Sequence, residues 1–276
     1  MNSKYSAAYL AIPAVGCLLV AWWILSAKSD APVIATSPDS KSAVSSSESE
    51  QPRQQAELSA KFNPTQTQPL SPAEYRALID AVTQGDEVRI QVDRRVGPEF
   101  VTEVASIKGS LFDLLLDGGG PDDQAMAELG RISTLEHLRV RLSPISDAGI
   151  ELLIGDNPPP LRVLNLPHAA ITHEGITQLQ RLPALEQLRL GGDQLDDRAA
   201  AAIAKLPKLR SLHLIGPSLT GAGLDALSQA PKLGSLYLDD CPLPDDAWQR
   251  LFTAKPNMHV HVDQRHHDRD PNQHSH

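Results

Sequence analysis

The residues best suited to chemistry gather at the end of the chain, in the stretch MHVHVDQRHHDRDPNQHSH. Imidazole nitrogens and carboxylate oxygens are ligands for zinc, copper and nickel, and Asp263, Asp268 and Asp270 lie among the histidines of this stretch. Two of the histidines are two positions apart, so on a strand both would point to the same face. The stretch is therefore a candidate site for a divalent transition metal. Its possible ligands are His259, His261, His266, His267, His274 and His276.

A second explanation of the histidines stays open. They are interspersed with Asp, Val and Gln, which is unlike a run of histidines added for purification. The stretch has no cysteine and no HxxxH pair on a helix, and a mobile segment loses conformational entropy when it orders around an ion. A solvated His/Asp-rich tail at residues 263–276, with incidental metal affinity, would give the same composition.

No other stretch indicates catalysis. The loop DGGGPDD from Asp117 to Asp123 lacks the spacing of a phosphate-binding motif, and its aspartates would repel an anion. It is better explained as a strand-to-helix loop. No nucleophile, base and orienting acid stand at a spacing that predicts a catalytic site, so we expect the protein not to be an enzyme. The net charge of -9 and the pI near 5.5 argue against nucleic acid as a partner.

The elements that must position these residues are visible as an internal repeat. The motif LxxLxL occurs six times, and successive starts differ by 24, 26, 24, 24 and 24 residues. The single 26 coincides with an insertion, GDNPPP. The stretch EVRIQV is a degenerate first copy, because Ile90 and Val92 precede Leu114 and Leu116 by 24 positions. The six motifs start at Leu111, Leu135, Leu161, Leu185, Leu209 and Leu233.

Each strand motif is followed by the signals of a short helix. Residues that can cap a helix N-terminus come first, and a small residue follows three positions later, where it would let the helix lie close to the strand. Prolines then end the helices before the next strand. The caps are Ser146, Thr172, Asp196 and Thr220, the small residues are Gly149, Gly175, Ala199, Gly223 and Ala247, and the prolines are Pro183, Pro207 and Pro231. Upstream, Ser71 and Glu74 form a capping box for a helix that would close the first repeat.

This pattern resembles bacterial leucine-rich repeat proteins. It is most similar to the 24-residue type with a T/S-D-x-G-L helix start, akin to the cysteine-containing subclass, and it covers residues 87–262. The resemblance implies an α/β fold, a leucine-rich repeat solenoid in which a curved parallel sheet is covered by outer helices. At the position where the family has Asn or Cys, the copies hold Gly119, Ser143, Ala169, Asp193, Pro217 and Cys241, so we expect less regular curvature. We expect Cys241 to be a small buried residue.

The alternation of side chains along each strand predicts an exposed concave face opposite the helices. Arginine and tyrosine on this face are residue types favoured at interaction hot spots. Such positions are also polar in proteins that bind nothing there, so this alternative stays open. The candidate ligand-binding residues are His137, Arg139, Arg141, Asn165, Arg189, His213 and Tyr237.

The N-terminal part predicts a membrane tether. Residues 7–27 carry no charge and would span about 31 Å as a helix, close to the hydrocarbon thickness of a bilayer. A cleaved signal peptide fits less well, because its apolar core is usually shorter and the LSA before Lys28 fits a cleavage site poorly. A lipoprotein at Cys17 fits less well, because the apolar run continues beyond Cys17. Lys4 favours a cytoplasmic N-terminus and an extracytoplasmic C-terminal domain. The expected organisation is a cytoplasmic stub and transmembrane anchor at 1–28, a disordered Ser/Gln/Pro-rich linker at 29–70, a repeat domain at 71–262 with a helical cap at 71–86, and the tail at 263–276.

Two hypotheses for function follow. In the first, the chain is a non-catalytic interaction module, displayed outside the cytoplasm on its membrane tether, that binds another protein or an envelope polymer. In the second, it is an envelope metal-binding protein that uses the His/Asp-rich end.

Overall fold

The computed structural model describes residues 68–272. The anchor predicted at residues 7–27, most of the linker, His274 and His276 lie outside the described residues. Within residues 68–272, no helix has the length and hydropathy needed to cross a bilayer.

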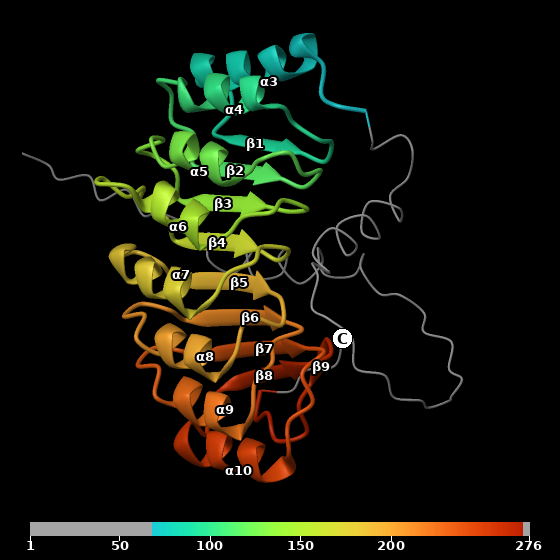
Figure 1. Cartoon of the computed structure of the whole chain (residues 1–276), viewed down its shortest axis with the longest axis vertical. Coiled ribbons are helices and arrows are strands. Elements are labelled where there is room, and N and C mark those ends of the chain that lie inside the picture. Colours follow the sequence, from blue (N-terminus) through green and yellow to red (C-terminus); the bar gives the residue numbers. More distant parts are fainter. Residues whose placement is uncertain (1–67, 273–276) are drawn as a thin grey trace, which may run out of the picture. The chain divides into compact units, whose positions relative to one another are not determined.

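One sheet of nine strands, ordered as in the sequence, runs through the described part of the chain (Figure 1). Neighbouring strands from β1 to β8 are parallel, and β9 is antiparallel to β8. The degenerate first copy is confirmed, because Ile90 pairs with Leu114 and Val92 with Leu116. The strands are β1 Arg89–Val92, β2 Asp113–Leu116, β3 His137–Val140, β4 Val163–Leu166, β5 Gln187–Gly191, β6 Ser211–Ile215, β7 Ser235–Asp239, β8 His259–Val262 and β9 Arg265–His266.

The helices lie along one side of this sheet (Figure 1). From α4 to α10 each helix connects two successive strands, which makes an α/β repeat fold with a parallel sheet, consistent with a leucine-rich repeat solenoid. The helices are α3 Pro72–Gln84, α4 Pro98–Ala105, α5 Asp123–Leu129, α6 Asp147–Ile154, α7 His173–Gln178 followed by the 3-10 turn η3 Leu179–Arg181, α8 Asp197–Ile203, α9 Gly221–Ser228 and α10 Asp245–Ala254.

The core lies between the sheet and the helices. Alternate strand residues such as Leu138 and Val140 point into it and are almost fully buried, as are Ile150 and Leu153 of α6. A strand and a helix from a single repeat leave their sides open, so the stacked neighbours complete the burial of each copy.

The first repeat is closed by α3, as the sequence predicts. Ser71 Oγ accepts a hydrogen bond from Glu74 N, and the carboxylate of Glu74 accepts one from Ser71 N at 2.9 Å. Arg94 also contacts Glu74, at 2.6 Å. Hydrogen bonds from the Ser71 side chain and backbone, followed by Arg94, lower the pKa of Glu74 to about 2.

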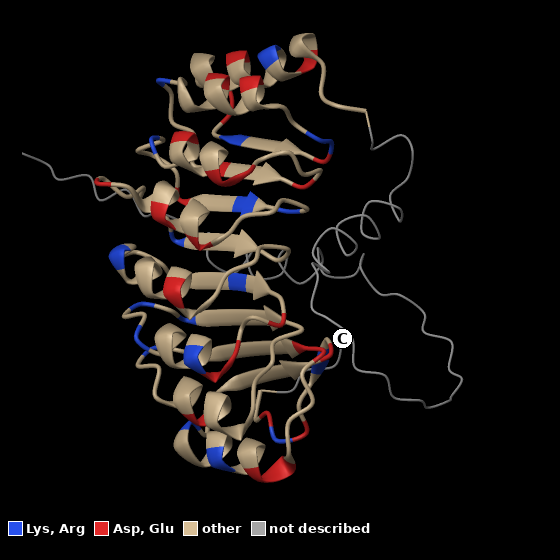
Figure 2. Ribbon diagram, viewed as in Figure 1, with Lys and Arg blue, Asp and Glu red and all other residues tan. Residues whose placement is uncertain are grey.

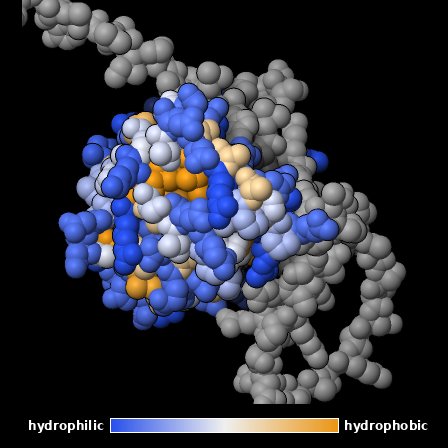
Figure 3. Space-filling view, turned by 90° about the horizontal axis from the view of Figure 1, so that it is seen from above, coloured by the Kyte–Doolittle hydropathy of each residue, from blue (hydrophilic) through white to orange (hydrophobic). Residues whose placement is uncertain are grey.

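Viewed from the α3 end, the surface is largely hydrophilic, with an apolar patch near its middle (Figure 3).

Two segments differ from the sequence-based expectation. Helix α4 was not predicted, although its Phe100, Val101 and Val104 are buried in the core. The assignment of residues 263–276 to a solvated tail is wrong for residues 263–272. This segment turns back after Val262, adds β9 to the sheet and buries the side chain of Asp270.

Candidate functional site

The face of the sheet opposite the helices carries a middle row of side chains, which consists of the fifth position of each LxxLxL motif and the matching position of β8. Strand register places its members side by side across β2 to β8. The expectation of an exposed row is wrong, because each member is less than a tenth exposed. Parallel strands lie about 4.8 Å apart, so residues in register stand against one another. The middle row consists of Leu115, Arg139, Asn165, Arg189, His213, Tyr237 and His261.

The two rows beside the middle row are more accessible. Arg141, which the sequence places among the binding residues, lies just after β3 and is partly exposed, whereas His137 at the other end of that strand is buried. Partly exposed side chains also include Gln187 on β5 and Ser211 on β6. A macromolecule that approaches this face therefore meets these flanking rows first.

Two titratable side chains of the middle row, Arg139 and His213, are paired with acids at the strand ends. Arg139 forms an ion pair with Asp117, and His213 Nε2 lies 2.8 Å from Asp239 Oδ2. Burial lowers the pKa of His213, and the nearby charge of Arg189 acts in the same direction against the opposing effect of Asp239. Burial opposes the ionisation of Asp239, but its hydrogen bond from His213 outweighs this, so the pKa of the carboxyl is below its usual value. The neutral imidazole therefore donates to a carboxylate.

Basic and amide side chains are in register over three central strands. Arg139, Asn165 and Arg189 occupy matching positions of β3, β4 and β5, and Figure 2 shows the basic residues within β3 and β5. Asn165 is 1% exposed, and its Oδ1 has no hydrogen-bond partner among the described residues. A buried amide oxygen without a partner is costly, so this position has hydrogen-bonding capacity that a ligand could use.

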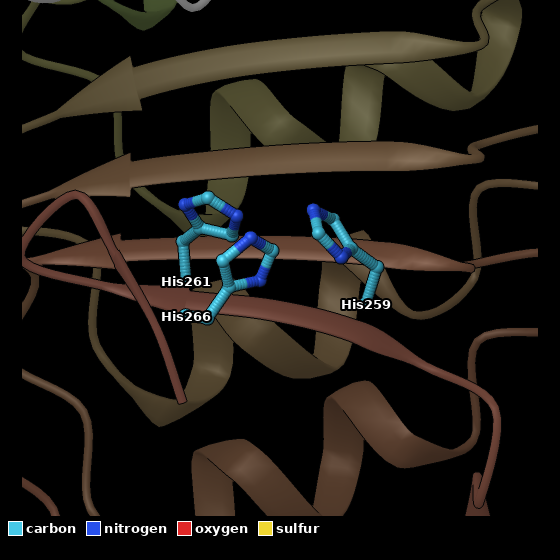
Figure 4. Close-up of side chains that lie close together, drawn as sticks. All are labelled: His259, His261 and His266. Atoms are coloured by element: carbon cyan, nitrogen blue, oxygen red, sulfur yellow. The ribbon is translucent and has the colours of Figure 1, made fainter. Parts of the chain in front are cut away.

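A cluster of imidazoles lies at the last strands of the sheet (Figure 4). His259 and His261 lie two apart on β8, and His266 of β9 pairs with His261 across the antiparallel ladder. One ring nitrogen from each of the three lies within 4.8 Å of the others. The ring centroids of His261 and His266 are 4.2 Å apart, and that of His259 is 4.7 Å from His261 and 5.0 Å from His266.

Asp270 holds two of these rings. Its Oδ2 lies 2.9 Å from His259 Nδ1 and 3.1 Å from His266 Nδ1, and it also accepts a hydrogen bond from Val260 N. Its Oδ1 accepts from Asn272 N at 2.8 Å. Burial opposes ionisation, but these hydrogen bonds outweigh it and hold the pKa of Asp270 below its usual value. A buried carboxylate thus fixes imidazoles from two strands.

Two other predicted metal ligands within the described residues, His267 and Asp263, do not join this cluster. His267 packs against Trp248 and Phe252, with ring centroids 4.6 and 5.3 Å away, and burial lowers its pKa. Asp263 accepts a hydrogen bond from Asp240 N. His274 and His276 lie outside the described residues. Of the six histidines proposed from the sequence, the structure brings three together.

The turn between β8 and β9 makes this convergence possible. Asp263 and Gln264 both have positive φ, 49° and 63°, which is the backbone of a two-residue hairpin turn of type I′. Such turns favour Asn-Gly or Asp-Gly, and Asp-Gln is a weak signal for one. The hairpin and the burial of Asp270 could therefore not be predicted from the sequence.

Comparisons with known proteins find similarity among solved structures alone. No model of a protein family matches the chain, and no curated protein matches it. Among solved structures, the chain is similar to an internalin (inlF) from Listeria monocytogenes, over 67% of this chain and 72% of the internalin, with 12% sequence identity and a TM-score of 0.34.

Proposed function

We propose that the repeat domain is a non-catalytic module that binds an acidic segment of another protein across β3, β4 and β5. The observation that carries this proposal is the in-register set Arg139, Asn165 and Arg189. The two arginines would bind carboxylates, and Asn165 Oδ1, which has no partner among the described residues, would accept a backbone N–H of the same segment. The two arginines are two strands apart, which is about 10 Å.

This set suits carboxylates. Guanidinium groups bind carboxylates in a bidentate manner, and arginine and tyrosine are enriched among the residues that dominate binding energy. Arg139 is already paired with Asp117, so a carboxylate of the partner would compete with an internal one. The partner would reach the buried middle row through the partly exposed flanking row that includes Arg141.

A selection from a library of random peptides on the immobilised full chain tests this proposal. We expect the selected peptides to be enriched in Asp and Glu, and their binding to weaken at least tenfold in the double variant Arg139→Gln, Arg189→Gln. The matched control removes two arginines on the helix side, Arg131→Gln and Arg198→Gln. Both are exposed, and they pair with Glu128 and Asp196 of their own repeats. Neutral or basic selected peptides, or equal losses in the two double variants, would contradict the proposal.

The membrane tether belongs to the same proposal. The uncharged stretch at residues 7–27 supports an anchor that displays the repeat domain outside the cytoplasm, where the partner would be a protein or an envelope polymer. Digestion of intact cells and of inside-out vesicles with protease tests the orientation, and we expect cleavage of the repeat domain only from the outer side. Displacement of selected peptides by an acidic polysaccharide would favour the polymer as partner.

A further inference from the structure

We propose that His259, His261 and His266 bind a divalent transition-metal ion of the zinc type, and that Asp270 is a positioning residue for two of these ligands. The proposal is independent of peptide binding at β3 to β5. It rests on three imidazoles brought together from two strands and on one buried carboxylate.

The distances are those of a site that closes with small side-chain movements. The ligand nitrogens lie within 4.8 Å of one another. Around a tetrahedral zinc ion with Zn–N bonds of about 2.1 Å, ligand nitrogens are about 3.4 Å apart. The backbones of β8 and β9 are already joined by the His261–His266 pair, so only the side chains would have to move to bring the nitrogens to that separation.

The donor set selects the class of metal. Imidazole nitrogen suits zinc, copper and nickel, whereas calcium and magnesium require a shell of oxygens. A set of three histidines leaves the fourth position of a tetrahedral ion to water or another donor. The three rings lie at the β8–β9 end of the sheet face opposite the helices. There the Tyr237 ring is 5.0 Å from that of His261 and 5.8 Å from that of His259.

Asp270 has the position of an orienting carboxylate. A histidine that binds a metal commonly donates its other ring N–H to a carboxylate, which fixes the tautomer and the orientation of the ring. Asp270 Oδ2 contacts Nδ1 of both His259 and His266, so it would direct Nε2 of these rings to the ion. The hydrogen bonds from Val260 N and Asn272 N keep this carboxylate in place.

The first experiment is a titration of the full chain, freed of metal by a chelator, with Co²⁺ and then with Zn²⁺. We expect one Co²⁺ per chain with the visible absorption of a nitrogen-ligated ion, displacement of Co²⁺ by Zn²⁺, and a higher melting temperature with either metal. Absence of Co²⁺ binding to the wild-type chain at micromolar concentrations would overturn the proposal.

Variants separate the cluster from the histidines near the C-terminus. His266→Ala should weaken Co²⁺ binding at least 100-fold, and His259→Asn, at a partly exposed side chain, serves as a second test if His266→Ala melts differently without metal. The control His274→Ala, His276→Ala should bind Co²⁺ as the wild type does. The reverse result, with loss in the control and retention in His266→Ala, would place metal binding elsewhere and refute the cluster.

Asp270→Asn tests the positioning role. An orienting carboxylate predicts about a 10–100-fold weaker affinity with the cobalt absorption bands retained, because the three nitrogen ligands stay the same. If Asp270 were itself a ligand, the bands would change shape. An unchanged affinity would show that the carboxylate does not position the rings for metal. The melting temperature of the metal-free variant reports any purely structural effect.

Discussion

The carboxylate of Asp147 in α6 occupies the space that a side chain at Gly175, in helix α7 of the following repeat, would need. A Cβ on Gly175 would be 2.2 Å from Asp147 Oδ1. This carboxylate accepts hydrogen bonds from Thr172 N at 2.9 Å and from Thr172 Oγ1 at 2.5 Å, so it ties the start of α6 to the cap of α7.

The same arrangement recurs wherever the residues permit it. Asp123 binds the backbone and hydroxyl of Ser146 and Asp197 those of Thr220, and a Cβ on Gly149 or Gly223 would lie 2.3 or 2.4 Å from the corresponding carboxylate oxygen. Two repeats have another residue in place of the aspartate, His173 and Gly221. In the repeat after each of them, the Ser or Thr cap and the glycine are also replaced, by Asp196 and Ala199 after His173 and by Pro244 and Ala247 after Gly221. The glycines therefore make room for the carboxylate of the preceding repeat.

The first prediction is that Gly175→Ala destabilises the protein. Alanine favours a helix by up to about 1 kcal/mol over glycine, but a contact of 2.2 Å forces the carboxylate aside. We expect a net loss of about 1–3 kcal/mol, typical of overpacking, in the free energy of unfolding measured in urea. Adding Asp147→Ala should make the effect of Gly175→Ala smaller or reverse it. Equal effects of Gly175→Ala with and without Asp147 would contradict the proposed relationship.

A matched control for this prediction exists in the next repeat. Ala199 occupies the column of Gly175, but the residue before it in the ladder is His173 and not aspartate. Ala199→Gly should therefore cost only the helix preference and the loss of one buried methyl group, with no dependence on residue 173.

The strand register could be predicted from the sequence because its cause is local and repeated. Each LxxLxL motif buries the side chains at its three apolar positions, so a spacing of 24 residues places Leu114 beside Ile90 without any knowledge of distant contacts. The Asp147–Gly175 contact was not foreseen. Recurring aspartates at helix starts are explained equally well by capping and the helix dipole, and only three-dimensional stacking shows that some of them serve the next repeat.

The candidate metal cluster was foreseen in part for a related reason. Strand alternation places His259 and His261 on one face, as expected. The partner strand that brings His266 depends on a turn with a weak sequence signal, and the selection of Asp270 among three nearby aspartates depends on which of them is buried against β8. Those properties arise from packing and are not encoded in spacing.

The second prediction concerns acid and helix α3. The pKa of Glu74 is lowered from 4.5 to about 2, so its ionised form stabilises the fold above pH 4.5, and this contribution is lost as the pH falls through about 2. We expect the amides of α3 to lose protection against hydrogen exchange in this range before those of α8 do. Glu74→Ala should reduce that protection already at pH 7, and Glu87→Ala, at an exposed residue beyond the helix, should not. Loss of protection in α3 and α8 at the same pH would contradict this prediction.

The third prediction concerns Cys241, whose side chain is buried and whose thiol pKa is raised by burial. The thiolate is the form that reacts with alkylating agents, so both burial and the raised pKa should slow the reaction. In a Cys17→Ser background, we expect iodoacetamide to modify Cys241 at pH 8 only at urea concentrations that unfold the protein. Rapid modification without denaturant would show that the thiol is accessible.

The last prediction is a pH dependence of stability that originates at His213. The imidazole faces Asp239, Arg189 and the ring of Tyr237, and burial with the charge of Arg189 lowers its pKa below 6.5. The unfolded chain therefore binds more protons than the folded chain just below pH 6.5, and the free energy of unfolding should fall as the pH decreases through this value. His213→Gln should remove this part of the slope. Arg189→Gln should raise the pKa of His213 in an NMR titration, because it removes a nearby positive charge. A His213 titration at or above 6.5 in the wild-type protein would show that burial does not govern this histidine.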